Sequence, residues 1–311
     1  MIKIPTIPAR YIKKISIQGL SGRALELPDT APKARTPLLL IYGHHSSLER
    51  MYSIAQGFND YGPVVVPDLP GFGGMPALGT IGKAPTVDNL ADYLAGYIRM
   101  RFPNGQRFIL EGMSLGFVVA TRMLQRHPEL AKQITHFVSL VGFVNADDFA
   151  ATPRRRRLFA RTARALAAKA TSSTFRRLFL QKPVIALTYH LRARSHPKMK
   201  GYNWQERQRL ITFEVTLWKS NEVRTYFSTL AEMLSLDLTK QKIALPVEHV
   251  AVLSDQYFDN EKVVEDMKKI FTSVRMHTAE LPNHVPTVLE EVADARHLIP
   301  ATLTKVFASK G

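Results

Sequence analysis

The chain has 311 residues, more than a usual single domain, and its 45% hydrophobic and 22% charged residues predict a globular protein with a large apolar core. Because it contains no cysteine, disulfides, thiol nucleophiles and cysteine-ligated metals are excluded. The formal charge of +16 is concentrated in residues 151–210, where sixteen Lys and Arg accompany a single acid, Glu206, so the charge indicates a separate module.

Strand and helix patterns alternate before residue 148. Residues 14–28 predict a hairpin with Gly22 in its turn, and residues 37–43 predict a short buried strand. The next helix is expected to be capped by Ser46, through a Ser-x-x-Glu box that ends at Glu49. Further strands are expected at 62–68, 107–112 and 135–143, with helices at 86–100 and 114–127.

The alternation resumes after residue 240. We expect strands at 247–255 and 273–281, a helix around 262–271 and a C-terminal helix from about Thr287. Strands alternating with helices predict an α/β fold with a mostly parallel sheet covered on both faces. The domains are therefore predicted as a core of residues 1–147 and 241–311 with a basic helical cap, residues 148–240, inserted in it.

Aromatic side chains of the predicted cap are candidates to line the roof of a pocket, although most of them must serve ordinary helix packing. They are Phe175, Phe179, Tyr189, Tyr202, Trp204, Phe213, Trp218, Tyr226 and Phe227.

The sequence Gly-x-Ser-x-Gly at residues 112–116 directly follows a predicted strand and opens a predicted helix. Such a turn is sharp, and glycines on both sides of the serine leave room for neighbouring elements. We expect the Ser114 hydroxyl to project at the carboxyl edge of the sheet as a nucleophile. The backbone N–H of Leu115, at the start of the helix, is then placed to bind an oxyanion.

A serine hydroxyl needs a base to take its proton, most commonly a histidine oriented by a carboxylate. Of the ten histidines, His284 lies in the loop between the last predicted strand and the last helix, where it can reach the sheet edge. His277 and His297 fall inside a strand and a helix and are expected to be structural. His44 and His45 precede the serine in a position better suited to lining the site.

The carboxylate that orients the base is predicted to be Asp255, which directly follows the strand 247–255 at the same edge of the sheet. Asp259, four residues further on, is the alternative acid. Asp147, which follows the strand 135–143, is the third choice. The order Ser114, Asp255, His284 is the chain order of α/β hydrolases.

With these residues in place, the chain resembles the α/β-hydrolase superfamily everywhere except in the insertion. The sequence PDLPGFGG at 67–74 is similar to the family's Asp-x-Pro-Gly-x-Gly loop, and LPNHVP at 281–286 to its Gly-His-x-x-Pro stretch. The segment LLLIYGHHSS occupies the place of the family's oxyanion segment. The resemblance implies that Gly43 makes the turn there and that the His44 backbone N–H is the second oxyanion donor.

Four residues depart from the family's pattern. Tyr42 stands where histidine is usual, Met113 replaces a frequent histidine of the elbow, and Asn283 replaces the glycine before the base. Phe117 replaces a glycine that often follows the elbow, which predicts tight packing there. None of these departures removes a catalytic group.

The predicted function is a serine hydrolase that cleaves a carboxylic ester with an apolar acyl chain through an acyl-enzyme intermediate. That reaction needs no metal and no organic cofactor. Because one fold supports many chemistries, an amidase, peptidase or acyltransferase is the alternative enzyme. A protein that does not catalyse but binds a membrane or nucleic acid through its basic segment is the alternative of another class.

The basic segment predicts an amphipathic helix and an anionic partner, because hardly any acids compensate its charge. We rank an anionic membrane surface above RNA, since residues 154–169 offer only Phe159 as an aromatic platform for bases. A nucleic-acid partner is therefore not expected. The arginines assigned to membrane contact are Arg154, Arg155, Arg156, Arg157, Arg161 and Arg164.

The N-terminal residues lack the continuous apolar stretch and the cleavage site of a signal peptide. No run approaches the roughly 18 apolar residues that a membrane-spanning helix needs. We therefore expect a cytoplasmic protein, either soluble or bound at the periphery of a membrane.

Overall fold

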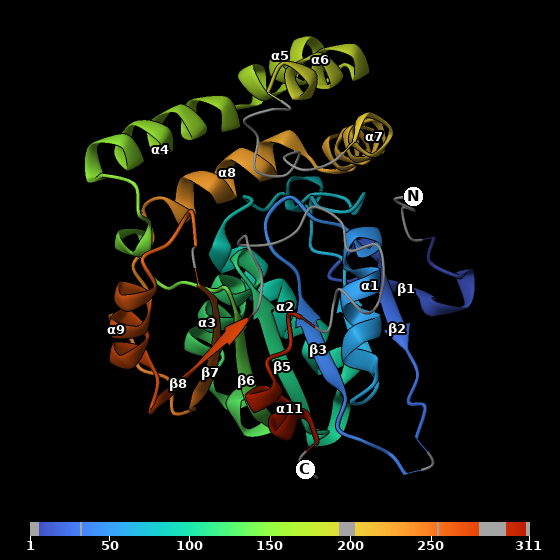
Figure 1. Ribbon diagram of the computed structural model, residues 1–311, viewed down its shortest axis with the longest axis vertical. Helices are drawn as coiled ribbons and strands as arrows, with labels where there is room; N and C mark the ends of the chain where they lie inside the picture. Colours follow the sequence, from blue (N-terminus) through green and yellow to red (C-terminus); the bar gives the residue numbers. More distant parts are fainter. Residues whose placement is uncertain (1–5, 32, 193–202, 254, 280–296, 309–311) are drawn as a thin grey trace.

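The computed structural model describes residues 6–31, 33–192, 203–253, 255–279 and 297–308 (Figure 1). Among these residues, eight strands form one sheet in the order β1-β2-β4-β3-β5-β6-β7-β8. The strands from β3 to β8 run parallel, whereas β2 pairs antiparallel with both β1 and β4. The bounds are β1 Ile12–Ile17, β2 Leu20–Leu27, β3 Leu38–Ile41, β4 Val64–Pro67, β5 Phe108–Met113, β6 Ile134–Leu140, β7 Val247–Val252 and β8 Val274–Ala279.

Helices cover both faces of the sheet, so the predicted fold class is confirmed. On one face, α1 (Leu48–Asn59) meets α11 (Ala301–Ala308), where the Phe58 and Phe307 rings lie 5.3 Å apart. The other face carries α2 (Val87–Arg101), α3 (Leu115–Arg126) and α9 (Asn260–Ile270). There Phe117 of α3 stacks on Phe137 of β6 with ring centroids 5.0 Å apart. The C-terminal helix expected to begin at Thr287 has its predicted start outside the described residues.

Between β6 and β7 the chain forms five described α-helices, which we call the helical layer. Figure 1 shows α7 and α8 above the carboxyl ends of the parallel strands and α4, α5 and α6 beyond them. The layer has its own hydrophobic cluster, which includes Leu210, Phe213 and Phe227 and is separate from the cluster around the sheet. The bounds are α4 Pro153–Ala167, α5 Lys169–Phe179, α6 Lys182–Arg192, α7 Trp204–Ser220 and α8 Val223–Met233.

The first hairpin turns three residues earlier than predicted. Gln18 and Gly19 connect β1 to β2 with φ angles of 52° and 85°, as a two-residue hairpin turn with left-handed positions requires. Gly22 lies inside β2 opposite Ile15 instead. A β-carbon there would come within 2.8 Å of the Met75 sulfur, so this glycine serves close packing and the prediction of a turn at Gly22 was wrong.

The cap of α1 also differs from the prediction. Ser47, not Ser46, is the N-cap residue, and its hydroxyl accepts a hydrogen bond from the Arg50 N–H. Glu49 does not close a capping box with Ser46, because its carboxylate accepts a 2.8 Å hydrogen bond from Arg23 of β2. The predicted box with Ser46 is therefore absent, and Glu49 forms a tertiary ion pair with Arg23.

Within the described part of the chain, no helix has both the length and the apolar character needed to cross a membrane. The same residues contain no group of three or more His, Asp or Glu side chains arranged to hold a metal ion.

Candidate active site

The turn between β5 and α3 holds Ser114. In the continuous stretch from Phe108 to Thr121, every residue is buried except Ser114, which is partly exposed. Its backbone has φ 49° and ψ −115°, a conformation with positive φ that is uncommon for any residue other than glycine. The Ser114 N–H donates to the Leu140 carbonyl of β6 at 3.0 Å, which ties the turn to the neighbouring strand.

Two glycines make this turn possible, as the motif predicted. A β-carbon on Gly116 would lie 2.1 Å from the Ile41 carbonyl oxygen of β3, and one on Gly112 would lie 2.4 Å from the Phe117 α-carbon. Both contacts are with backbone atoms that cannot move aside, so only glycine fits at either position. The start of α3 is thereby pressed against the end of β3.

Backbone strain gathers at the carboxyl ends of three adjacent strands. His45 after β3, Ser114 after β5 and Val141 after β6 have φ angles of 57°, 49° and 46°. Val141 is β-branched, and a positive φ is a strong outlier for such a residue. Strained residues persist only where the surrounding structure enforces them, and they cluster at functional sites.

The loop after β3 approaches the serine closely. A β-carbon on Gly43 would lie 3.2 Å from the Met113 carbonyl oxygen and 3.3 Å from the Ser114 β-carbon. The residue with the left-handed conformation in this loop is His45, so the implied role of Gly43 in making the turn is corrected to one of close approach. Within the described residues, the His44 N–H donates to no backbone carbonyl. The Leu115 N–H, first in α3, has no acceptor inside its own helix.

The His44 side chain cannot serve as the base through its Nε2 atom. That nitrogen lies 3.0 Å from the Tyr226 carbonyl oxygen, which can only accept, so Nε2 carries the proton in the neutral ring. Burial lowers the pKa of His44 to about 3, which keeps the imidazole neutral. Its ring lies 4.2 Å from the Tyr226 ring and 5.8 Å from the Phe72 ring, in a position that lines the site.

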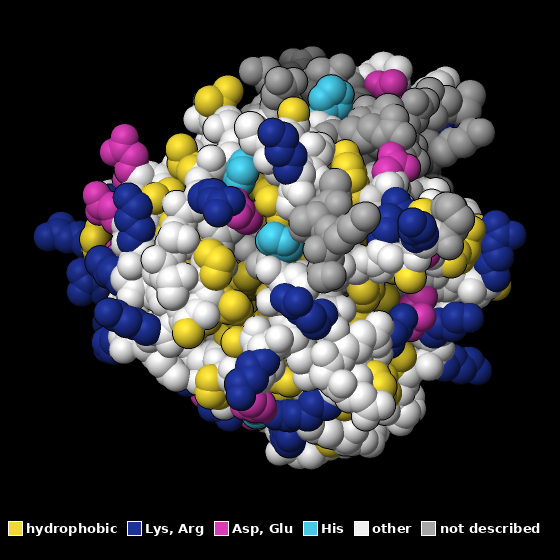
Figure 2. Space-filling view, turned by 90° about the horizontal axis from the view of Figure 1, so that it is seen from below, with side chains coloured by type: hydrophobic (Ala, Val, Ile, Leu, Met, Phe, Trp, Pro, Cys, Tyr) yellow, Lys and Arg dark blue, Asp and Glu magenta, His cyan; other side chains and the backbone are white. Residues whose placement is uncertain are grey.

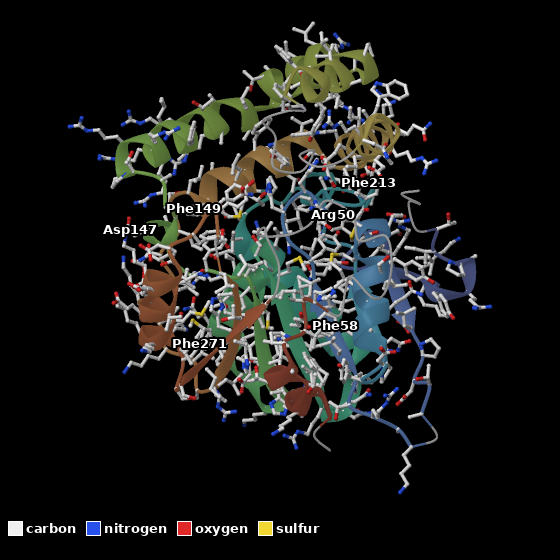
Figure 3. All side chains as sticks on the ribbon, viewed as in Figure 1. Arg50, Phe58, Asp147, Phe149, Phe213 and Phe271 are labelled. Atoms are coloured by element: carbon white, nitrogen blue, oxygen red, sulfur yellow. The ribbon has the colours of Figure 1, made fainter. Side chains whose placement is uncertain are left out.

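The carboxylates after β7 occupy different settings. Asp255 is partly buried, and its Oδ1 accepts hydrogen bonds from the Tyr257 and Phe258 N–H groups at 2.8 and 3.2 Å. Asp259 is the N-cap of α9, where its carboxylate accepts from the Lys262 N–H and pairs with the Lys262 ammonium at 3.2 Å. Asp147, the third choice, is exposed and pairs with Arg156 of α4 (Figure 3).

The predicted base, His284, lies outside the described residues, as does Tyr202 of the predicted roof. His277 lies in β8, as expected of a structural histidine. Its ring nitrogens lie 2.8 Å from Glu248 and 2.7 Å from the Thr302 hydroxyl.

A family model for the α/β-hydrolase fold matches residues 36–290. The chain belongs to this family. Among solved structures, this hydrolase is similar to an esterase from Exiguobacterium antarcticum, with a TM-score of 0.65, 14% identity and coverage of 95% of this chain and 99% of the other. It is also similar to a membrane phospholipase A described as a bacterial virulence factor, with a TM-score of 0.62, 19% identity and coverage of 95% and 84%. At these identities the likeness shows the fold alone.

Among curated proteins, the hydrolase is 31% identical over 115 residues to the biotin biosynthesis bifunctional protein BioHC of Cellvibrio japonicus. The matched residues make up 37% of this chain and 21% of that protein. This chain thus spans about a fifth of the length of the curated relative it matches.

The family's Asp-x-Pro-Gly-x-Gly loop anchors the helical layer of this hydrolase. The Gly74 N–H donates to the Ser220 carbonyl at 2.8 Å, and the Glu222 N–H donates to the Gly71 carbonyl at 2.7 Å. Gly73 donates to the Asn221 side chain at 3.0 Å. The junction of α7 and α8 is therefore held by main-chain hydrogen bonds next to the strand ends.

Tyr42, at a position where the family usually has histidine, holds the loop of residues 67–74 through two hydrogen bonds. Its hydroxyl donates to Asp68 at 3.2 Å and accepts from the Leu69 N–H at 2.7 Å. Burial raises the pKa of Asp68 to about 7, although the neighbouring Arg23 guanidinium opposes this. The substitution thus exchanges one hydrogen-bonding side chain for another.

A buried polar cluster that was not predicted from the sequence joins the helical layer to the hydrolase core. Glu214 of α7 is fully buried and accepts a 2.9 Å hydrogen bond from the Tyr189 hydroxyl of α6. The same carboxylate oxygen lies 3.4 Å from the His45 Nε2 atom. Arg50 of α1 donates to the His45 carbonyl at 2.9 Å and lies below Phe213 of α7 in Figure 3.

One signal could have revealed this cluster. Glu214 is flanked in the sequence by Phe213 and Val215, and an isolated acid within an apolar helix segment indicates a buried partner.

The tight elbow packing expected of Phe117 is confirmed. Its ring stacks on Phe137 and lies 6.0 Å from the Phe271 ring of the α9 end. A β-carbon on Gly142 would meet the Phe117 ring at 2.4 Å. The family often has a small glycine at the position of Phe117. In this chain the larger Phe117 ring fits because Gly142, after β6, has no side chain in its way.

Proposed function

We propose that this α/β hydrolase is a serine hydrolase that cleaves carboxylic esters with an apolar acyl chain. The observation that carries the proposal is the setting of Ser114, which is the one partly exposed residue in the otherwise buried stretch of residues 108–121 and has a strained backbone. A strained turn that exposes one hydroxyl at the end of a strand does not improve packing. A nucleophile, however, must be exposed to its substrate.

In the proposed mechanism, the Ser114 hydroxyl attacks the ester carbonyl carbon while the His284 imidazole takes its proton. The backbone N–H groups of His44 and Leu115 bind the resulting oxyanion. The tetrahedral intermediate collapses, the alcohol leaves with the proton from His284, and an acyl-serine remains. Water, deprotonated by the same imidazole, then attacks the acyl group, which releases the acid and restores Ser114. Asp255 orients the imidazole and stabilises its charged form.

The apolar acyl preference is supported by the residues around the oxyanion loop. His44 contacts Phe72 and Tyr226, and the His45 ring lies 4.5 Å from Trp218. Two of these aromatic residues come from α7 and α8. We propose the helical layer, with boundaries near residues 148 and 240, as the cap that forms the roof of the acyl pocket. The esterase and phospholipase A with the same fold are consistent with ester chemistry.

Ester specificity separates this proposal from the alternatives on the same fold. An amidase or peptidase would use the same nucleophile and would cleave p-nitroanilides as well as p-nitrophenyl esters, whereas an esterase would cleave only the esters at an appreciable rate. An acyltransferase would transfer the acyl group to an added alcohol faster than to water. Assays of a p-nitrophenyl ester series and the matching p-nitroanilides, with product analysis in the presence and absence of an alcohol acceptor, distinguish these activities.

The nucleophile is tested by replacing Ser114→Ala. Ester turnover should fall by several orders of magnitude and fluorophosphonate labelling should vanish, because a triad acts as a unit. The control is Ser16→Ala, an exposed serine of β1, which should leave both unchanged. Undiminished labelling of Ser114→Ala, measured by intact mass, would refute the proposal.

A further inference from the structure

Helices α4 to α7 of the layer expose large apolar side chains. Ten such residues are exposed among those that the structure describes, and six of them lie on α4 to α7. They define what we call the apolar outer surface. Its members, with exposed fractions of 49–69%, are Leu158 and Phe159 of α4, Leu178 and Phe179 of α5, Leu187 of α6 and Trp204 of α7.

These apolar side chains alternate with cations along the helices. On α4, Arg154, Leu158 and Arg161 follow one another at spacings of four and three residues, so they share one helix face. Ala160 and Ala163 are the buried residues of the same helix. On α5, Leu178 and Phe179 directly follow Arg176 and Arg177.

The cations of this surface have almost no anionic counterpart. Residues 149–205 contain no Asp or Glu. Within the described residues, the ion pair that α4 makes is the one between Arg156 and Asp147. The other exposed cations of α4 and α5 are Arg154, Arg155, Arg157, Arg161, Arg164, Lys169, Arg176 and Arg177.

The opposite end of the molecule has a different composition. Figure 2 shows Lys and Arg side chains interspersed with Asp and Glu, among single hydrophobic side chains. Such a mixture is ordinary for a solvated surface. Most of the exposed large apolar side chains of the described residues therefore lie in the helical layer beside uncompensated cations, whereas the face in Figure 2 carries charges of both signs.

Charge complementarity decides what can cover this surface. A second copy of the chain would bring its own uncompensated cations, so pairing two layers would be repulsive. Single-stranded RNA would neutralise the cations but would leave aliphatic Leu side chains in water. An anionic bilayer supplies both a negative headgroup layer and an apolar interior, and amphipathic helices with basic and Trp, Phe or Leu residues are suited to that boundary.

We propose that the outer surface of α4, α5 and α6, together with Trp204, docks on an anionic phospholipid bilayer. The arginines contact the headgroups while the Leu, Phe and Trp side chains enter the acyl boundary. Docking itself does not depend on the proposed ester chemistry. Combined with that chemistry, it places the helical layer between the bilayer and the strand ends that carry Ser114, where an apolar ester would arrive from the membrane.

The proposal is tested by co-sedimentation of the full chain with phosphatidylcholine vesicles that contain either no phosphatidylglycerol or about 30% of it. We use the Ser114→Ala variant beside the parent, so that binding is measured independently of hydrolysis. Binding should favour the anionic vesicles at least tenfold and should fall at least tenfold in 0.5 M salt, because surface charges are screened.

Two variants separate the cations from the apolar side chains. Replacing Arg154, Arg155, Arg157 and Arg161 by Gln should weaken binding at least tenfold. The matched control, with the exposed Lys13, Lys14, Lys132 and Lys242 replaced by Gln, has the same change in net charge outside the layer and should lose less than about twofold. Replacing Leu178 and Phe179 by Ser should also weaken binding, whereas Met100→Ser with Met276→Ser should not.

Insertion is read out by tryptophan fluorescence. The chain has two tryptophans, so Trp218→Phe leaves Trp204 as the single reporter. Its emission should shift to the blue on anionic vesicles and should be quenched by brominated acyl chains. Equal binding to both vesicle types, binding to single-stranded RNA without binding to vesicles, self-association of the chain in place of vesicle binding, or vesicle binding without a change at Trp204 would each overturn the proposal.

Discussion

Two aspartates, Asp255 and Asp259, follow β7, and their carboxylates make different hydrogen bonds. Asp259 caps α9 and pairs with Lys262, as an ordinary N-cap residue does. Asp255 is partly buried and is oriented by two backbone N–H groups. The geometry therefore supports Asp255 as the residue that orients the base.

Replacing Asp255→Asn should slow ester turnover by roughly 10⁴-fold, because the imidazole loses the carboxylate that fixes its tautomer and stabilises its charge. Asp259→Asn, the matched control, should keep turnover within a few-fold of the parent, since an amide oxygen can still cap a helix. Steady-state kinetics on a p-nitrophenyl ester measure both. A much larger loss in Asp259→Asn would reverse the assignment.

Glu111 of β5 is a second residue with an unusual setting. It is fully buried three residues before Ser114, and neither carboxylate oxygen has a hydrogen-bond partner among the described residues. Burial raises its pKa well above the ordinary range for a glutamate. The folded protein therefore holds a proton that the unfolded chain releases above about pH 4.5, and its stability falls as the pH rises beyond that value.

Glu111→Leu should increase the free energy of unfolding by about 1–3 kcal/mol, since it removes an unsatisfied buried polar group. The gain over the parent should be larger at pH 8 than at pH 5. The control is Glu248→Leu on the same face of the sheet, which should destabilise the fold because Glu248 binds His277 and Arg275. Urea unfolding at both pH values measures the effect. A Glu111→Leu variant less stable than the parent at pH 8 would contradict it.

Individual residues could be predicted from the sequence where a local pattern determines them. Ser114 was found because Gly-x-Ser-x-Gly stood between a strand and a helix pattern. The apolar neighbours of Glu214 indicate that it is buried with a partner, but the identity of that partner and the isolation of Glu111 could not be found this way, since both depend on elements distant in sequence. The hairpin turn was wrongly assigned to Gly22 because Gly19 lies only three residues before it. The local pattern does not show which of the two glycines forms the turn.

The helices of the layer differ from those of the core in how much they bury. Ten of the twelve residues of α3 are buried, whereas α4 buries Ala160 and Ala163 and α5 buries Ser172. Little free energy therefore holds α4 and α5 in place beyond their own hydrogen bonds.

We expect amides in the middle of α4 and α5 to exchange with solvent at least about 100-fold faster than those of α3, through openings that leave the sheet intact. Hydrogen exchange followed by mass spectrometry measures this. Anionic vesicles should slow exchange in α4 and α5 and leave α3 unchanged. Equal protection of α3 and α4 without vesicles would show instead that the layer and the core open together.

Elements were predicted well where periodicity is strong. The alternation of strands and helices in residues 62–143 appears in the structure with ends shifted by a few residues, because packing and capping determine the last turn. The helical character of the insertion was also predicted. Its division into five described helices was not, because the breaks between them depend on which helix each one packs against.

For the whole molecule, the parallel sheet and its helix-covered faces followed from the alternation of elements. The order of the strands in the sheet could not be derived from the alternation of elements and is given by the structure. The residues proposed for the site follow β3, β5 and β7, which are distant in sequence. They could therefore be proposed from their positions after strands, but the geometry between them could not be predicted. The assignments of Ser114, Asp255 and His284 as a triad stay predictions.

The insertion of the helical layer between β6 and β7 has a consequence for how the protein is made. These neighbouring strands are separated in the chain by residues 141–246, so their pairing closes a loop of about a hundred residues. During synthesis, β1 to β6 emerge first and can begin to assemble, while β7 must wait for the whole layer. Ser114 precedes the helical layer in the chain, whereas Asp255 and His284 follow it. The proposed nucleophile is thus made before the groups proposed to activate it, and the proposed triad can act only after the chain beyond the helical layer has been synthesised.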